Sequence, residues 1–206
     1  FQSEFDIFKE MSVASGRPIS ITVEQQDARP EWWLQLLDGI KKAQDDGIKM
    51  YGQVPPRATG ILMGLTASLN PFTLYPSFFE ISALSLDQKI GIMKDPEFKK
   101  KLLSEEPVSI GNPLVDEIIT SFNKMFRLGD PANYEPHPDS SILSESKKLN
   151  LTPQEILYDM LLEKNGRALI YHPLFNYEFG NLDHVETMLK HPYTIFGLGD
   201  AGAHCG

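Results

Sequence analysis

The alternation of amphipathic helical patterns with short β-branched runs is the sequence feature that most constrains the fold. A helical pattern that stops at Gly16 leads to ISITV, and a second, from Pro30 to Gly47, leads to IKMYGQV. Near the C-terminus RALIYHP and YTIFGL flank the helical NLDHVETMLKHP. Helices and strands in alternation are typical of a parallel sheet with crossover helices. We therefore expect an α/β protein.

A long stretch, residues 54–152, interrupts this alternation. It has helix-start signals of its own, a capping box at Ser85 and Gln88 and a proline at position 96, followed by the turn-rich FRLGDPANYEPHPDSS. Because it is too long for a simple loop, we expect a mainly helical insertion between strands. The remaining four β/α units amount to about half of an eight-stranded (β/α)8 barrel. Residues 1–206 are thus expected to form a partial barrel of the TIM type.

Composition limits the kind of protein and its partners. Nineteen basic and 28 acidic residues give a net charge of −9, and the absence of a basic stripe argues against nucleic acid as a partner. No apolar run approaches the roughly 20 residues that a membrane span needs. The single cysteine, Cys205, cannot form an internal disulfide, which fits a cytoplasmic protein.

The two ends suggest a piece of a longer protein. The chain begins at Phe1 within a helical pattern and stops at AGAHCG, directly after a strand. A partial barrel would leave strand edges open, so we expect the isolated chain to self-associate.

Polar residues follow the expected strands, and in a barrel such positions form the site. Arg57, between PP and ATG, could bind a carboxylate through two parallel hydrogen bonds from its guanidinium. Glu24, Gln25 and Gln26 are either solvated or functional. His184 and His191 are expected at the surface, and His137 lies in a proline-rich turn. The residues expected to bind substrate are Gln53, Arg57, His172, Asn176 and His204.

The motif GLGDAG after the last strand has two interpretations. It matches the G-x-G-x-x-G turn of dinucleotide-binding proteins. Asp200 would, however, place a carboxylate where the pyrophosphate must lie, and the motif follows the last strand rather than the first. An aspartate among glycines at a strand end is better explained by catalysis or metal binding, so we favour a hydrolase.

Four segments together resemble the amidohydrolase superfamily, in the branch of N-acyl-D-amino-acid deacylases (D-aminoacylase-like proteins). They cover nearly the whole chain in the family's order: GQVPPRATGILMGLTASLNPF, FRLGDPANYEP, ALIYHPLFNYEFGNLDHVETMLKHP and HPYTIFGLGDAGAHCG. The resemblance implies a metal-dependent hydrolase of linear amides on a (β/α)8 barrel, with an N-acyl amino acid as substrate. It also implies that Asp200 lies beside the metal, takes a proton from metal-bound water and passes it to the leaving amine.

The resemblance implies zinc as the metal, with most ligands outside this chain. The family's H-x-H pair would precede Phe1. Where the family often has a histidine, TVEQQD has Gln25 or Gln26, and an amide oxygen is a poor zinc ligand. One metal is therefore expected rather than two, and the isolated chain is expected to be inactive. The alternative is a non-catalytic protein that binds small molecules on the same scaffold, which the histidine-poor strand ends suggest.

Overall fold

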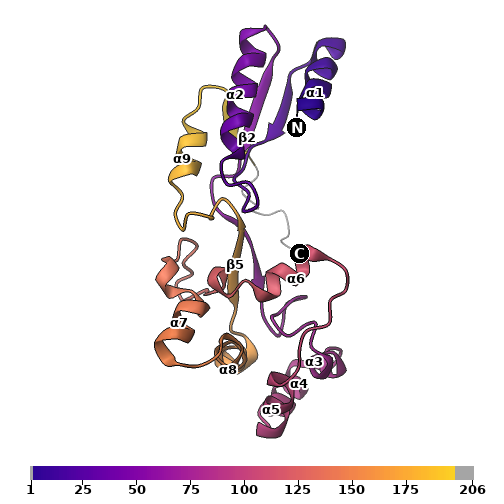
Figure 1. Ribbon diagram of the computed structural model, residues 1–206, viewed down its shortest axis with the longest axis vertical. Coiled ribbons are helices and arrows are strands. Elements are labelled where there is room, and N and C mark those ends of the chain that lie inside the picture. Colours follow the sequence, from indigo (N-terminus) through magenta and orange to yellow (C-terminus); the bar gives the residue numbers. More distant parts are fainter. Residues whose placement is uncertain (1, 198–206) are drawn as a thin grey trace. The chain divides into compact units, whose positions relative to one another are not determined.

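The computed structural model describes residues 2–197, and this part of the chain is a mixed α/β structure with two three-stranded sheets. The chain divides into two compact units (Figure 1). The first contains the residues up to Thr59 and those from Leu174 onward, and the second is Gly60–Pro173. Asp200, His204 and Cys205 lie outside the described residues. No described helix has both the length and the apolar composition that a bilayer crossing requires.

The first unit contains a parallel sheet of order β1-β2-β6. Its two long helices end at glycines in the left-handed region, Gly16 with φ of 63° and Gly47 with φ of 80°, as the sequence predicts. Its elements are α1 (Gln2–Ser15), β1 (Ile19–Thr22), α2 (Trp32–Asp45), β2 (Met50–Val54), α9 (Asp183–Leu189) and β6 (Thr194–Phe196). The expected alternation of helix and strand is confirmed in this unit.

The core of the first unit lies between the sheet and its helices. Gly52, in the middle strand, packs so closely that a Cβ atom there would lie 2.9 Å from Val23 and 3.0 Å from Thr194. Glycine at this position therefore allows the side chains of both flanking strands to pack over β2. The buried apolar residues of this core are Phe5, Val23, Trp33, Leu36, Leu37, Ile40, Ala43, Met50, Val54, Val185 and Met188.

The second unit combines short helices with a sheet of order β3-β5-β4, in which β4 is antiparallel to β5. The predicted capping box of Ser85 and Gln88 is present before α4, and Thr152 and Glu155 form another before α8. Its elements are β3 (Thr59–Met63), α3 (Pro76–Ile81), α4 (Leu86–Met93), α5 (Pro96–Leu103), α6 (Pro113–Thr120), η1 (Phe122–Lys124), β4 (Phe126–Arg127), η2 (Pro138–Ser140), α7 (Ile142–Leu149), α8 (Pro153–Gly166) and β5 (Ile170–Phe175).

The strand predicted in RALIYHP forms, but with partners that the sequence pattern does not predict. It is β5, which pairs with β3 and β4, two strands within the stretch expected to be a mainly helical insertion. Gly60 in β3 allows this pairing to be close, since a Cβ atom there would lie 2.7 Å from the carbonyl oxygen of His172 and 3.0 Å from Cα of Pro173. The described strands thus make two sheets of three.

We predict that Gly60→Ala lowers the free energy of unfolding by about 1–3 kcal/mol, because the added methyl meets backbone that cannot move aside. Gly91→Ala is the control: it lies on the exposed face of α4 with no atom within 4 Å of the new Cβ. That change should be neutral or stabilise by up to about 1 kcal/mol. Urea unfolding followed by circular dichroism measures both, and equal effects would contradict the close packing of β3 on β5.

Candidate functional site

The candidate site of the first unit is the edge where its parallel strands end. β1, β2 and β6 run in the same direction, and the N–H of Gly197, just after β6, donates to the carbonyl of Val54 at the end of β2 (2.8 Å). The carboxyl ends of the three strands therefore share one edge, where ligands bind in open α/β sheets. Of the residues predicted to bind substrate, Gln53, Arg57 and Asn176 belong to this unit.

Asn176 joins the segments that follow β1 and β2. Its Oδ1 accepts from the backbone N–H of Gln25 (2.7 Å), and its own N–H donates to the carbonyl of Gln25 (3.0 Å). Its Nδ2 donates to the carbonyl of Arg57 (3.3 Å). Asn176 is fully buried and has a left-handed backbone with φ of 61°, which asparagine tolerates better than most residues. The predicted site residues Asn176 and Arg57 are thus in direct contact.

Gln25 is buried, so the interpretation of this side chain as solvated is wrong. Its exposed fraction is 0%, and its Oε1 accepts from the backbone N–H of Glu178 (3.0 Å). Within the described part of the chain its Nε2 has no hydrogen-bond partner. Because the amide oxygen is already used by a backbone N–H, Gln25 is poorly suited to replace a histidine as a metal ligand.

Arg57 and Gln53 make contacts close to their own strands. Nη1 of Arg57 donates to the carbonyl of the next residue, Ala58 (3.0 Å). Nε2 of Gln53 donates to Oγ of Ser20 on the neighbouring strand β1 (2.7 Å). Both side chains are partly exposed. Their roles in substrate binding remain predictions.

His172 belongs to the second unit, where it is part of β5 and is 3% exposed. Within residues 2–197, no three His, Cys, Asp or Glu residues lie close enough together to hold a metal ion. The assignment of Asp200 to a metal and to catalysis, and of His204 to substrate, concerns residues outside this range.

His184, which we expected at the surface, is buried instead, with an exposed fraction of 6%. Its ring lies 6.4 Å from that of Trp33 and 5.9 Å, edge to face, from that of Phe179. Burial lowers the pKa of His184, and the backbone of Asn176 and the charge of Asp183 oppose this only in part. The spacing of apolar residues in α9 predicts an exposed position for His184, because it does not show that the rings of Trp33 and Phe179 cover this side of the helix.

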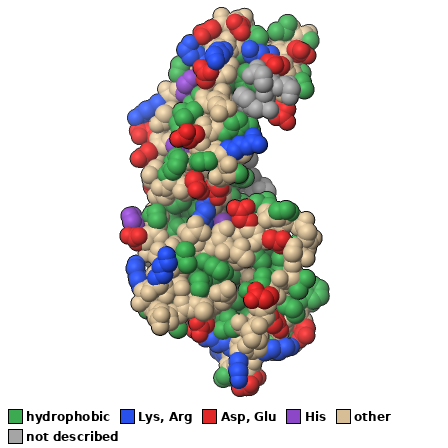
Figure 2. Space-filling model, in the orientation of Figure 1, with side chains coloured by type: hydrophobic (Ala, Val, Ile, Leu, Met, Phe, Trp, Pro, Cys, Tyr) green, Lys and Arg blue, Asp and Glu red, His purple; other side chains and the backbone are tan. Residues whose placement is uncertain are grey.

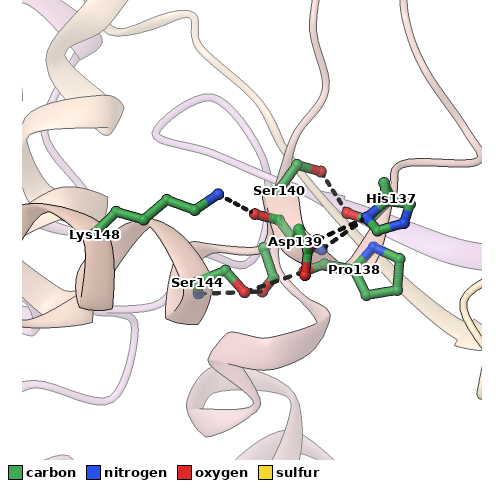
Figure 3. Close-up of polar contacts among 7 residues, drawn as sticks. His137, Pro138, Asp139, Ser140, Ser144 and Lys148 are labelled. Carbon is green, nitrogen blue, oxygen red and sulfur yellow. Dashed lines mark hydrogen bonds and ion pairs between the residues drawn. The ribbon is translucent and has the colours of Figure 1, made fainter.

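His137 has a structural role in the turn before α7 (Figure 3). Its Nδ1 accepts from the backbone N–H of Asp139 (3.2 Å), and its carbonyl accepts from Oγ of Ser140 (2.6 Å). Nζ of Lys148 donates to the carbonyl of Asp139 (2.8 Å). These contacts satisfy turn backbone groups, and the His137 side chain is 77% exposed.

Charged side chains of both signs are interspersed on the face shown in Figure 2. Several are paired along helices, as Lys41 is with Asp45 (2.7 Å) and Lys42 with Asp38 (2.6 Å) on α2. This arrangement adds no argument for a nucleic-acid partner.

Comparisons of the chain with protein-family models, with curated proteins and with solved structures give no match. The resemblance noted in the sequence therefore stays a prediction, and the function has to be argued from the strand-end site.

We predict that Asn176→Ala lowers the free energy of unfolding by about 2–5 kcal/mol, because buried backbone groups of Gln25 and Arg57 lose their partner. Asn150→Ala is the control, since Asn150 is left-handed (φ 55°) but exposed. That change should cost only about 1–2 kcal/mol. Urea unfolding compares the two, and a loss at position 176 no larger than at position 150 would contradict the role of the amide.

We predict that the free energy of unfolding falls as pH is lowered through 6.5, in part because of His184. The unfolded chain binds the proton at the ordinary histidine pKa, whereas the folded chain, with its lowered pKa, binds it only at lower pH. His184→Phe should make the decline between pH 7.5 and 5.5 shallower, whereas His137→Gln, at an exposed position, serves as the control. An unchanged pH slope in His184→Phe, measured by urea unfolding at each pH, would exclude this contribution.

Proposed function

We propose that this chain is part of a metal-dependent amidohydrolase on a (β/α)8 barrel, which removes the acyl group from N-acyl amino acids. One observation supports the proposal: β6 pairs in parallel with β2, so its carboxyl end shares an edge with the segments that contain Gln25 and Arg57, and GLGDAGAH follows β6 in the sequence. We propose that the carboxylate of Asp200, which follows this strand in the sequence, acts at this edge as a catalytic residue.

The described residues offer little for binding a metal ion. No cluster of possible ligands exists within residues 2–197, and the amide oxygen of Gln25 is engaged by Glu178. These residues do not make a metal site by themselves. Zinc is proposed with Asp200 beside it and with its main ligands outside this chain.

The roles of the chain's own residues follow from their chemistry. We propose Asp200 as the general base that removes a proton from the attacking water and returns it to the leaving amine. The Arg57 guanidinium is proposed to bind the carboxylate of an amino acid. Asn176 donates to the backbone carbonyl of this residue. Gln53 and His204 are proposed as further substrate contacts.

The second candidate is a binding protein that keeps the scaffold but does not catalyse hydrolysis. It is favoured by the histidine-poor strand ends of the sequence and by the structural use of Gln25. The two candidates differ in whether the full-length protein contains bound metal.

We predict that Asp200→Asn in the full-length protein lowers kcat for hydrolysis of N-acetyl amino acids by about 10²–10⁴-fold and leaves the fold intact. Asp38→Asn, at an exposed position of α2, is the control and should keep normal turnover. Dialysis against a chelator should abolish activity, and added zinc should restore it. Near-normal kcat in Asp200→Asn would contradict the proposal; a metal-free protein that binds N-acetyl amino acids would favour the second candidate.

A further inference from the structure

A pocket of about 270 Å³ opens between α1, β1 and α2 of the first unit. Its volume suits a small ligand, since drug-sized sites begin at about 300 Å³. Most of its wall is apolar, and its polar groups come from α1 and from the end of β1. The lining residues are Glu4, Phe5, Phe8, Ile21, Thr22, Glu24, Gln26, Trp32 and Leu36.

The charged side chains in the described lining of this pocket are all acidic. Its described lining includes the carboxylates of Glu4 and Glu24 but no Lys, Arg or His. Glu24 is partly buried, and burial raises its pKa, whereas a hydrogen bond with the Gln26 side chain acts in the opposite direction. A cation bound beside Glu24 would favour the ionised carboxylate that burial disfavours.

Two aromatic rings of the lining already lie near cations of the chain itself. The guanidinium of Arg29 already lies over the Trp32 ring at 5.4 Å, and Nζ of Lys9 lies 6.0 Å from the centre of the Phe5 ring. Arg29 lines a separate hollow to which Trp32 also contributes, so it does not belong to the lining of this pocket. Carboxylates with aromatic rings around an apolar space are the groups that recognise organic ammonium ions.

We propose that this pocket binds a primary ammonium ion that carries a short apolar chain. The ammonium group lies beside Glu24, and the chain lies against Phe8, Trp32 and Leu36. A bare metal ion fits less well, because much of the wall offers no oxygen ligand. The proposal is independent of the hydrolase: it involves neither Asp200 nor a metal, and it holds or fails without hydrolytic activity.

The test is titration of the 206-residue chain with hexylammonium chloride by calorimetry, with 1-hexanol as the neutral ligand of matching shape. We expect hexylammonium to bind at least tenfold more tightly than hexanol, and more weakly as salt is added. In NMR spectra the amides of Thr22 and Glu24 and the indole of Trp32 should shift. Equal binding of the two ligands, no saturable binding, or shifts confined to other residues would overturn the proposal.

Variants separate the specific carboxylate from the general negative charge. Glu24→Gln keeps the shape and should weaken hexylammonium binding at least fivefold, with hexanol binding unchanged. Glu10→Gln removes one acidic charge from an exposed position of α1 outside the lining and should change binding less than twofold. Unchanged affinity in Glu24→Gln would also overturn the proposal; if that variant does not fold, Glu4→Gln and the NMR map of the unaltered chain decide.

Discussion

The buried amide of Asn176 is the interaction on which the strand-end face of the first unit depends. Backbone groups that leave a sheet lose their ladder partners, and when buried they need others. Asn176 supplies them to Gln25 and Arg57, which lie 151 and 119 positions away in the sequence. The side-chain oxygen Oε1 of Gln25 in turn accepts a hydrogen bond from the backbone N–H of Glu178. Three segments distant in the chain are thus fixed by two side-chain amides, and the candidate site is built on them.

Local features of the fold could be predicted because local physics decides them. The glycine stops at Gly16 and Gly47 and the capping boxes at Ser85 and Thr152 need only a few neighbouring residues. The partners of β5 could not be predicted, since a short run such as RALIYHP indicates that a strand forms but not which strands pair with it. The same limit explains His184 and Gln25, whose burial is set by side chains from other elements.

The candidate site also combines features that the sequence predicts with features that it does not. Arg57 could be singled out because polar residues after strands gather at one edge of a parallel sheet. Asn176 could be singled out as a polar residue after a strand, although that strand, β5, belongs to the other sheet. Their contact could not be predicted, because it uses the carbonyl of Arg57 rather than its guanidinium. The pocket beside Glu24 was missed for a related reason: its walls come from α1, β1 and α2, and no sequence motif joins them. The proposed hydrolase and the proposed ammonium site therefore rest on different observations.

The most direct test of this arrangement is amide hydrogen exchange measured residue by residue by NMR. We predict that the amides of Gln25, Asn176 and Glu178 exchange as slowly as that of Gly52, which donates within the sheet region to Tyr193 (2.9 Å). Slow exchange at all three positions would show that the buried amides hold the strand-end segments in the native state. Exchange at the rate of an unprotected turn would contradict the buried hydrogen bonds of Asn176 and the candidate site that depends on them.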